Sequence, residues 1–165
     1  MVKDSVVMVL DCGGGTVDIT VHKLTCNPDE RFLCEELLPS SGGCQWGSKF
    51  VDMHFEQFLE QFFGAEFFET YKKNAMARLD ILKHFEMLKR KFNPGQDERS
   101  RLQLSYLGEE LTSAKLGEFV RVYNEKVTQE AEADGSTPAV LKQRGASSVD
   151  LPPALVQSFF RPLFD

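Results

Sequence analysis

The sequence predicts a mixed α/β fold in which a small sheet at the start of the chain is followed by helices. Residues 5–10 form an uninterrupted apolar run that ends at a glycine triplet, and residues 17–22 alternate between apolar and polar side chains. The first pattern is typical of a buried strand and the second of a half-buried strand, so we expect them to pair antiparallel across the glycines. From residue 50 onwards the apolar residues recur at helical spacing instead.

A third strand and two helices are expected next along the chain. Residues 32–38 favour a strand, which we expect to end at the Ser-Ser-Gly-Gly run 40–43. A helix with one apolar face is expected from Phe50 and should stop near Gly64, because glycine commonly ends helices. A second helix is predicted over residues 76–92, where an Asn-Pro-Gly sequence ends the pattern.

The last third of the chain has weaker patterns. A short strand is expected over residues 102–106. Residues 129–148 carry almost no large apolar side chain and are expected to form a flexible surface insertion. Asp150 is expected to cap a final helix over residues 150–165, with a proline in its first turn.

The composition is that of an ordinary soluble domain and disfavours several partners. The chain has 165 residues, of which 42% are apolar and 27% charged, enough for one domain or a piece of a larger one. No apolar stretch approaches the roughly 18 residues of a membrane-spanning helix. Because the net charge of −6 repels phosphate backbones and anionic lipid, neither nucleic acid nor a membrane is expected as a partner.

The cysteines indicate the redox environment. Cys12, Cys26, Cys34 and Cys44 include no Cys-x-x-Cys pair of the kind that binds zinc. We therefore expect reduced thiols that pack as small buried apolar residues, in a cytoplasmic protein. The even number of cysteines leaves an oxidised form open.

The motif with the clearest chemistry lies at the turn between the first two strands. Asp11 and Asp18 bracket the triplet Gly13–Gly15 and the hydroxyl of Thr16. Glycines allow the backbone to approach a phosphate closely, and their N–H groups can bind an anion, while the two carboxylates could hold a hydrated magnesium ion or position a water molecule. A glycine hairpin made only for tight turning is the alternative interpretation.

This run resembles the second phosphate loop of the seventy-kilodalton heat-shock chaperones, which belong to the actin and hexokinase superfamily of ATPases. That loop reads Asp-Leu-Gly-Gly-Gly-Thr-Phe-Asp, and residues 11–18 match it at six of eight positions. Gly47 and Asp52 stand where the family has a glycine turn that leads into a helix. The similarity extends over residues 5–93, is thin afterwards, and is closest to the divergent member-twelve branch.

A second motif resembles the helix with which this family clamps adenosine. Glu86, Lys89 and Arg90 lie at positions i, i+3 and i+4, on one face of the second predicted helix. Asn93 stands where the family has serine. A carboxylate can accept hydrogen bonds from ribose hydroxyls, an ammonium can donate, and a planar guanidinium can stack on adenine. A solvated charged face is the alternative interpretation of the same spacing.

The resemblance implies roles for these residues and a partial actin-like ATPase domain of the ribonuclease H-like type. It implies ATP or ADP and Mg²⁺ as cofactors. Gly13–Gly15, Thr16 and Gly47 would hold the phosphates, and Asp11 would orient magnesium through water. Asp18 would help to position water or metal. Glu86, Lys89, Arg90 and Asn93 would contact adenosine.

Half of the family's nucleotide cleft has no counterpart in this sequence. The first phosphate loop, the catalytic lysine and the second adenosine loop are absent, and fourteen phenylalanines are a large number for a stand-alone domain. We therefore expect a fragment that does not hydrolyse ATP by itself and that contacts the rest of the ATPase domain or another protein. The alternative is a truncated or degenerate protein-interaction module with weak or no nucleotide binding.

These expectations divide the 165 residues into regions of one partial nucleotide-binding domain. Residues 1–50 form the phosphate-loop sheet, and residues 51–108 the helical region that clamps adenosine. The predicted insertion over residues 129–148 and the terminal helix over residues 150–165 complete it.

Overall fold

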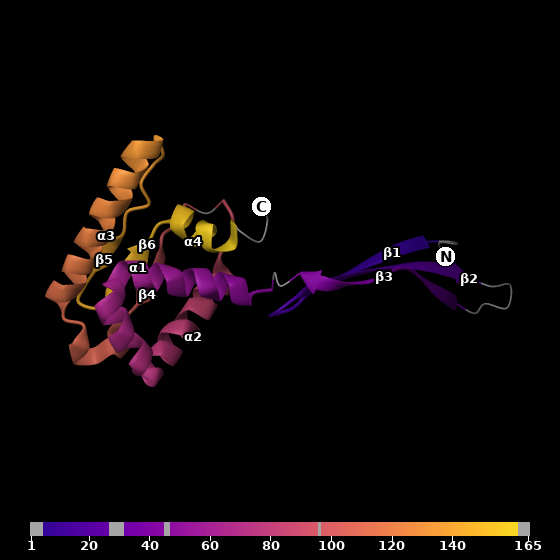
Figure 1. The fold of residues 1–165 in the computed structure, drawn as a ribbon, viewed down its shortest axis with the longest axis horizontal. Coiled ribbons are helices and arrows are strands. Elements are labelled where there is room, and N and C mark those ends of the chain that lie inside the picture. Colours follow the sequence, from indigo (N-terminus) through magenta and orange to yellow (C-terminus); the bar gives the residue numbers. More distant parts are fainter. Residues whose placement is uncertain (1–4, 27–31, 45–46, 96, 162–165) are drawn as a thin grey trace. The chain divides into compact units, whose positions relative to one another are not determined.

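The chain is divided into two compact units, which are described separately. The computed structural model describes residues 5–26, 32–44, 47–95 and 97–161. Unit 1 is Met1–Val51, and unit 2 is Asp52–Asp165. Strands dominate unit 1, whereas unit 2 contains helices and a second small sheet (Figure 1).

Unit 1 is a three-stranded antiparallel sheet. Its strands are β1 (Ser5–Cys12), β2 (Val17–Cys26) and β3 (Phe32–Cys44), in the order β1-β2-β3. The predicted hairpin across the glycines is confirmed, with Cys12 paired to Val17. The predicted end of the third strand at residues 40–43 is wrong. Shifts of register between β2 and β3 accommodate the additional residues, and such bulges are a common place for glycine in a strand.

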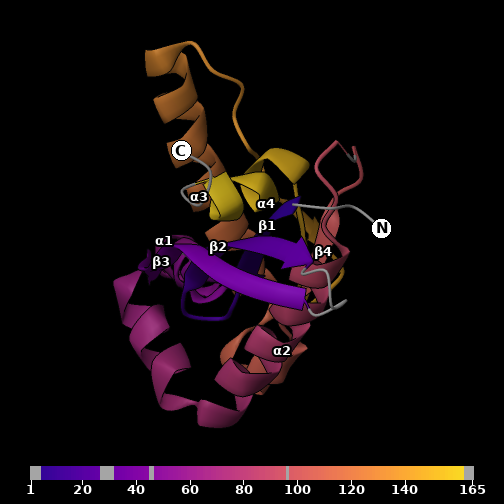
Figure 2. The same cartoon turned by 90° about the vertical axis from the view of Figure 1, so that its right-hand side faces the viewer.

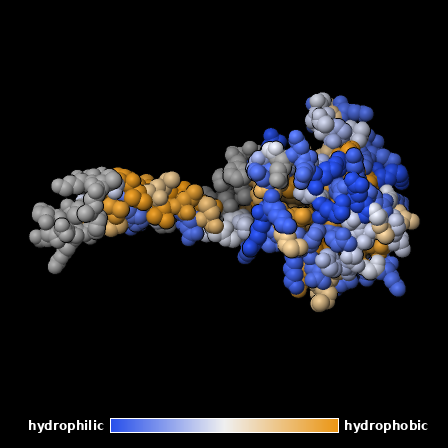
Figure 3. Space-filling model, turned by 180° about the vertical axis from the view of Figure 1, so that it is seen from behind, coloured by the Kyte–Doolittle hydropathy of each residue, from blue (hydrophilic) through white to orange (hydrophobic). Residues whose placement is uncertain are grey.

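The apolar side chains of β1 are exposed, although the sequence predicts a buried strand. Met8 is 63% exposed and Leu10 is 54% exposed. Apolar residues are prominent on the surface of the strands in Figure 3. The described part of unit 1 consists of this sheet and the start of one helix, so it has no second layer to cover the strands. The two cysteines Cys12 and Cys34 are likewise exposed, contrary to the prediction that they are buried.

Two helices follow, largely as the sequence predicts. Helix α1 is Lys49–Lys73, and α2 is Ala75–Lys91. At Gly64 the backbone has φ 74° and ψ 158°, a conformation that is essentially restricted to glycine. The first helical segment therefore ends at Gly64 as predicted, but a second segment follows directly and continues to Lys73. The side chain of Asn74 caps α2 by accepting a hydrogen bond from the amide of Ala77 at 3.1 Å.

The rest of unit 2 contains a second antiparallel sheet, in the order β4-β6-β5. Its strands are short, and each pairs with its neighbour over three or four residues. The elements in chain order are β4 (Ser100–Gln103), the 3₁₀ helix η1 (Ser105–Glu110), α3 (Ser113–Asp134), β5 (Lys142–Arg144), β6 (Ser148–Leu151) and α4 (Pro153–Phe160).

Three sequence predictions differ from the structure in this part of the chain. The short strand expected over residues 102–106 is instead β4 at Ser100–Gln103, and the 3₁₀ helix η1 begins at Ser105. Residues 129–148 include the last turns of α3 and all of β5, so the segment has regular structure, while its flexibility stays a prediction. Asp150 does not cap the final helix: it lies in β6, where its buried carboxylate pairs with Arg101 and Arg144. The N-cap of α4 is Pro152, which provides no side-chain hydrogen bond.

Aromatic rings form much of the core of unit 2. Phe55 of α1 stacks on Phe85 of α2 with ring centroids 3.8 Å apart, and Phe159 of α4 meets both rings edge-on. Tyr123 of α3 contacts Phe58 in an edge-on arrangement as well. Offset and edge-on pairs are the arrangements that aromatic quadrupoles favour. One aromatic cluster therefore joins α1, α2, α3 and α4, whose arrangement can be followed in Figures 1 and 2.

Loss of the stacked ring should destabilise unit 2. We expect Phe85→Ala to lower the free energy of unfolding by about 3–5 kcal/mol, because it removes a buried ring and leaves a cavity. Urea unfolding followed by circular dichroism measures the change. Met87→Ala, two residues away on the same helix but with its side chain about half exposed, is the control and should change the stability by less than about 1 kcal/mol. Equal effects of the two substitutions would contradict this description of the core.

Candidate functional site

The glycine loop, residues 13–16, closes the hairpin between β1 and β2. The amide of Gly13 donates a hydrogen bond of 2.8 Å to the carbonyl of Thr16. None of the three glycines has φ in the left-handed region. A Cβ on Gly15 would meet nothing within 4 Å, and one on Gly14 would only touch the Ser48 hydroxyl at 4.0 Å. Tight turning therefore does not explain why glycine stands at positions 14 and 15.

The carbonyl groups of the triplet all accept hydrogen bonds from residues 47–49. Gly47 donates to Gly15 at 3.3 Å, Ser48 to Gly13 at 3.3 Å, and Lys49 to Gly14 at 2.9 Å. In a trans peptide the C=O of one residue and the N–H of the next point in opposite directions. The amides of Gly14, Gly15 and Thr16 thus point away from residues 47–49. Among the described residues, the amides of Gly14 and Gly15 have no acceptor.

Gly47 is required by this contact. It is buried, and a Cβ at this position would lie 2.4 Å from the carbonyl carbon and oxygen of Gly14. No real side chain tolerates such a distance, so the segment can approach the loop only without a Cβ. In the structure, Gly47 supports the glycine loop on the side of its carbonyl groups.

Two carboxylates lie beside the glycine loop. Asp11 and Asp18 are direct partners in the register of β1 and β2. The Thr16 hydroxyl donates to a carboxylate oxygen of Asp18 at 3.0 Å. Like charges directly opposite each other repel, and no described lysine or arginine forms an ion pair with either group. A cation bound between them would relieve this repulsion.

The described residues contain no preformed metal centre. They include no group of three or more histidine, cysteine, aspartate or glutamate side chains that could hold a metal ion. Asp11 and Asp18 are two carboxylates, which suits a magnesium ion that keeps several of its waters rather than one enclosed by protein ligands. The arrangement fits the water-mediated role that the sequence predicts for Asp11.

A second cluster is assembled on α2. Lys89 Nζ lies 2.5 Å from Glu86 Oε2, and Arg90 Nε lies 2.7 Å from Glu86 Oε1. Hydrogen bonds from Lys89 and then Arg90 hold the pKa of Glu86 below its ordinary value. The side chain of Arg90 is 79% exposed and is therefore accessible to a ligand. Asn93 is also exposed, in the segment that follows α2.

Asp52 is a member of this cluster that the sequence matched to the family without a role. It lies in the first turn of α1, and its Oδ1 is 2.8 Å from Lys89 Nζ. The Lys89 side chain is only 9% exposed. Burial opposes its charge, but the hydrogen bonds to Asp52 and Glu86 outweigh burial and raise the pKa of Lys89. Lys89 therefore joins α1 to α2 and fixes Glu86.

The structure brings together the residues of each motif within one unit. Asp11, Thr16, Asp18, Gly47 and the glycine triplet are assembled in unit 1. Glu86, Lys89 and Arg90 are assembled in unit 2. Ion pairs between helices leave no periodic pattern in a sequence, so spacing could not reveal that Asp52 pairs with Lys89. The signal that could have pointed to Asp52 is its match to the family.

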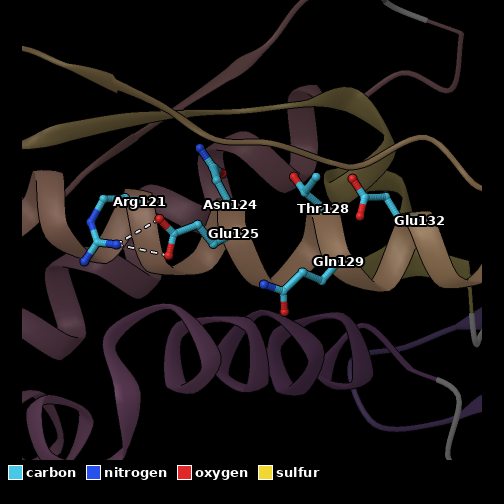
Figure 4. Close-up of a pocket in the computed structure, with 6 residues that line it drawn as sticks. All are labelled: Arg121, Asn124, Glu125, Thr128, Gln129 and Glu132. Atoms are coloured by element: carbon cyan, nitrogen blue, oxygen red, sulfur yellow. Dashed lines mark hydrogen bonds and ion pairs between the residues drawn. The ribbon is translucent and has the colours of Figure 1, made fainter.

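The surface of unit 2 has a depression that is separate from the predicted site residues. A shallow depression of about 530 Å³ lies along α3 and is lined by polar side chains, among them Arg121 and Glu125, whose ion pair of 2.8 Å is drawn in Figure 4. None of the predicted site residues lines it. None of the helices in the described part of the chain has the length and apolar character that crossing a bilayer requires.

The chain is similar to known proteins, each of which it matches over part of its length. The relatives are heat-shock proteins of the seventy-kilodalton group. Heat shock 70 kDa protein 12B of Homo sapiens is 42% identical over 88 residues, which are 53% of this chain and 12% of that relative. Heat shock 70 kDa protein 12A of Homo sapiens and that of Mus musculus are each 37% identical over 100 residues, which are 60% of this chain and 14% of each relative.

These relatives confirm the resemblance to the member-twelve branch that the sequence motifs indicated. The chain spans 12–14% of the length of the curated relatives it matches. No family model matches the chain. No solved structure matches it either.

The ion pairs of Glu86 make a prediction about acid stability. A carboxylate whose pKa is depressed on folding stabilises the fold above its unfolded pKa, here about 4.3, and this contribution is lost as the pH falls through the folded pKa. We expect Glu86→Gln to lower the melting temperature at neutral pH, and the difference from the parent to shrink as the pH falls below about 4.3. Circular dichroism melts at a series of pH values measure it.

A variant of the partner is the control for this prediction. Lys89→Met removes the largest cause of the depressed pKa, so adding Glu86→Gln to that variant should change the acid dependence much less. A Glu86→Gln effect that is constant across the pH range would show that the ion pairs do not stabilise unit 2.

Proposed function

We propose that this chain is part of the ATP-binding domain of a heat-shock-type chaperone ATPase, in which the glycine loop binds the phosphates and α2 binds the adenosine of ATP or ADP. The observation that carries the proposal is the orientation of the loop. Its carbonyls are occupied by residues 47–49, whereas the amides of Gly14 and Gly15 have no acceptor among the residues that the structure describes, and the space beside their Cα atoms is open. Consecutive free N–H groups without side chains are what a phosphate requires.

In this proposal the loop binds and the carboxylates hold the metal. The amides of residues 14–16 donate to the β- and γ-phosphate oxygens. The Thr16 hydroxyl, which donates to Asp18 in the structure, donates to a phosphate oxygen after it rotates away from that carboxylate. Asp11 orients Mg²⁺ through its water, and Asp18 helps to position water or metal. Magnesium, when bound, neutralises charge on the phosphates, and phosphoryl transfer depends on positioning and charge neutralisation more than on covalent chemistry by the protein. Gly47 acts indirectly, by supporting the loop.

The roles on α2 follow from its hydrogen bonds. Glu86 is held in place by Lys89 and Arg90 and has free lone pairs to accept the ribose hydroxyls. Lys89 has two of its three donors engaged, so it can donate once more to the ligand. The exposed guanidinium of Arg90 can stack on adenine. Asn93, just beyond the helix, supplies a further hydrogen bond.

We propose that this chain contributes to binding the nucleotide but does not hydrolyse ATP by itself. The counterparts of the first phosphate loop and of the catalytic lysine are not in the sequence, so hydrolysis requires the rest of an ATPase domain. We propose that this remaining part, or a protein that takes its place, is the partner of the chain in the cytoplasm. Steady hydrolysis by the purified chain that survives Asp11→Ala would contradict the assignment.

Titration of the purified chain with MgATP, followed by amide NMR, tests the phosphate site. We expect the resonances of Gly14, Gly15 and Thr16 to shift. Gly15→Ala should weaken binding roughly tenfold, about 1.4 kcal/mol, while leaving stability unchanged, because its Cβ enters only open space where the ligand would lie. Phosphate-loop residues that do not respond to millimolar MgATP would contradict the proposal.

Gly47→Ala is the matched comparison. Its Cβ would collide with the Gly14 carbonyl, so we expect it to destabilise unit 1 by about 1–3 kcal/mol in urea unfolding, even without nucleotide. The two alanine variants thus separate a glycine needed for the ligand from one needed for the fold. Destabilisation by Gly15→Ala equal to that by Gly47→Ala would mean that both glycines are structural.

A protein-interaction module with weak or no nucleotide binding is the second candidate. The exposed apolar side chains of the strands in unit 1, among them Val6, Met8 and Leu38, favour it. The same titration discriminates between the two functions. A chain that is indifferent to nucleotide but binds a protein through these strands would have the second function.

A further inference from the structure

The sheet β4-β6-β5 carries a group of positive side chains on one face. Arg101 and Lys142 are both register partners of Asp150, and Arg144 lies two residues beyond Lys142 on the same face. We call Arg101, Lys142 and Arg144 the basic face. The opposite face of the sheet contributes Leu102, Val149 and Leu151 to the core, so the basic face is the outer one.

The carboxylate of Asp150 fixes two guanidinium groups. Its side chain is 6% exposed, and it accepts hydrogen bonds from Arg101 Nε at 3.3 Å and Arg144 Nε at 2.6 Å. Burial opposes the charge of Asp150, but these hydrogen bonds outweigh it and keep its pKa below the ordinary value. The Asp150 carboxylate is therefore ionised at neutral pH and binds both arginines.

Both arginines keep most of their donors free. Each uses only its Nε, and among the described residues the Nη groups of Arg101 and Arg144 have no acceptor. The two side chains are 62% and 60% exposed. The fold already orders these long side chains, so binding an anion to the free Nη groups loses less conformational entropy.

The local charge is opposite to that of the whole chain. Arg101 and Arg144 pair with the carboxylate of Asp150, and Lys142 is a register partner of the same residue, whereas the chain carries a net charge of −6. Arg99 is occupied by the main-chain carbonyls of Val140 and Asp150, so it adds charge without offering its donors. An acidic ligand is attracted to this face by its local positive charge.

We propose that the basic face binds an acidic segment of another protein, with its carboxylates paired to Arg101, Lys142 and Arg144. The three cations stand on the two outer strands of the sheet, which are about 9.5 Å apart. In an extended segment the carboxylates of alternating residues are about 7 Å apart and can reach both strands. Guanidinium groups with free Nη donors bind carboxylates with two hydrogen bonds at once.

Fluorescence anisotropy tests the proposal on the purified chain. The probe is a labelled peptide of alternating glutamate and serine, and the same peptide with glutamine in place of glutamate is its control. We expect the acidic peptide to bind at low ionic strength and the glutamine peptide not to bind. Arg101→Gln with Arg144→Gln should weaken binding about tenfold. Lys142→Gln, an exposed position that leaves the Asp150 pairs intact, should weaken it by a smaller factor.

A charge-matched variant decides whether the site is specific. Arg121→Gln with Lys126→Gln removes the same charge from exposed positions on α3 and should leave binding unchanged. Equal losses in the two double variants, or no binding of the acidic peptide to the parent, would overturn the proposal. Two further results would also overturn it: displacement of the peptide by equimolar inorganic phosphate, and self-association of the chain that the basic-face variants abolish.

Discussion

The contact between Gly47 and the glycine loop is the constraint on which the candidate phosphate site depends. A backbone that approaches the Gly14 carbonyl this closely has no room for a Cβ. Because residues 47–49 occupy the three carbonyls of the loop, peptide planarity turns the following amides to the other side. Two segments that are distant in the sequence therefore create the proposed anion-binding surface, and they can approach each other because Gly47 has no Cβ.

A buried cation has the corresponding role in unit 2. Lys89 is largely removed from water, which is unfavourable unless its charge is paired. Asp52 and Glu86 provide that pairing from two different helices, so the same ion pairs stabilise the contact of α1 with α2 and orient the groups proposed to meet adenosine. Asp150 does the converse in the second sheet, where a buried anion orders two exposed arginines. In both places ion pairs within the fold orient groups that we propose bind a ligand.

Much of the fold was predictable because its patterns are local. The alternation after the glycines predicts the β1–β2 hairpin, and helical spacing with Asn-Pro-Gly predicts α2 closely. The failures have non-local causes. The third strand passes through residues 40–43 because bulges in its pairing with β2 absorb them, and Asp150 belongs to a strand because Arg101 and Arg144 come from two other strands to neutralise it.

The sequence by itself determined the two motifs, their order and their likeness to a heat-shock ATPase, because residue types at fixed spacing are visible in one dimension. It also determined that Glu86, Lys89 and Arg90 share a face, since helical geometry is local. Only the tertiary structure decided which way the loop amides point, which glycine supports the loop, and that Asp52 pairs with Lys89. These depend on segments distant in the sequence meeting in space, where sterics and desolvation act between neighbours that no local pattern records.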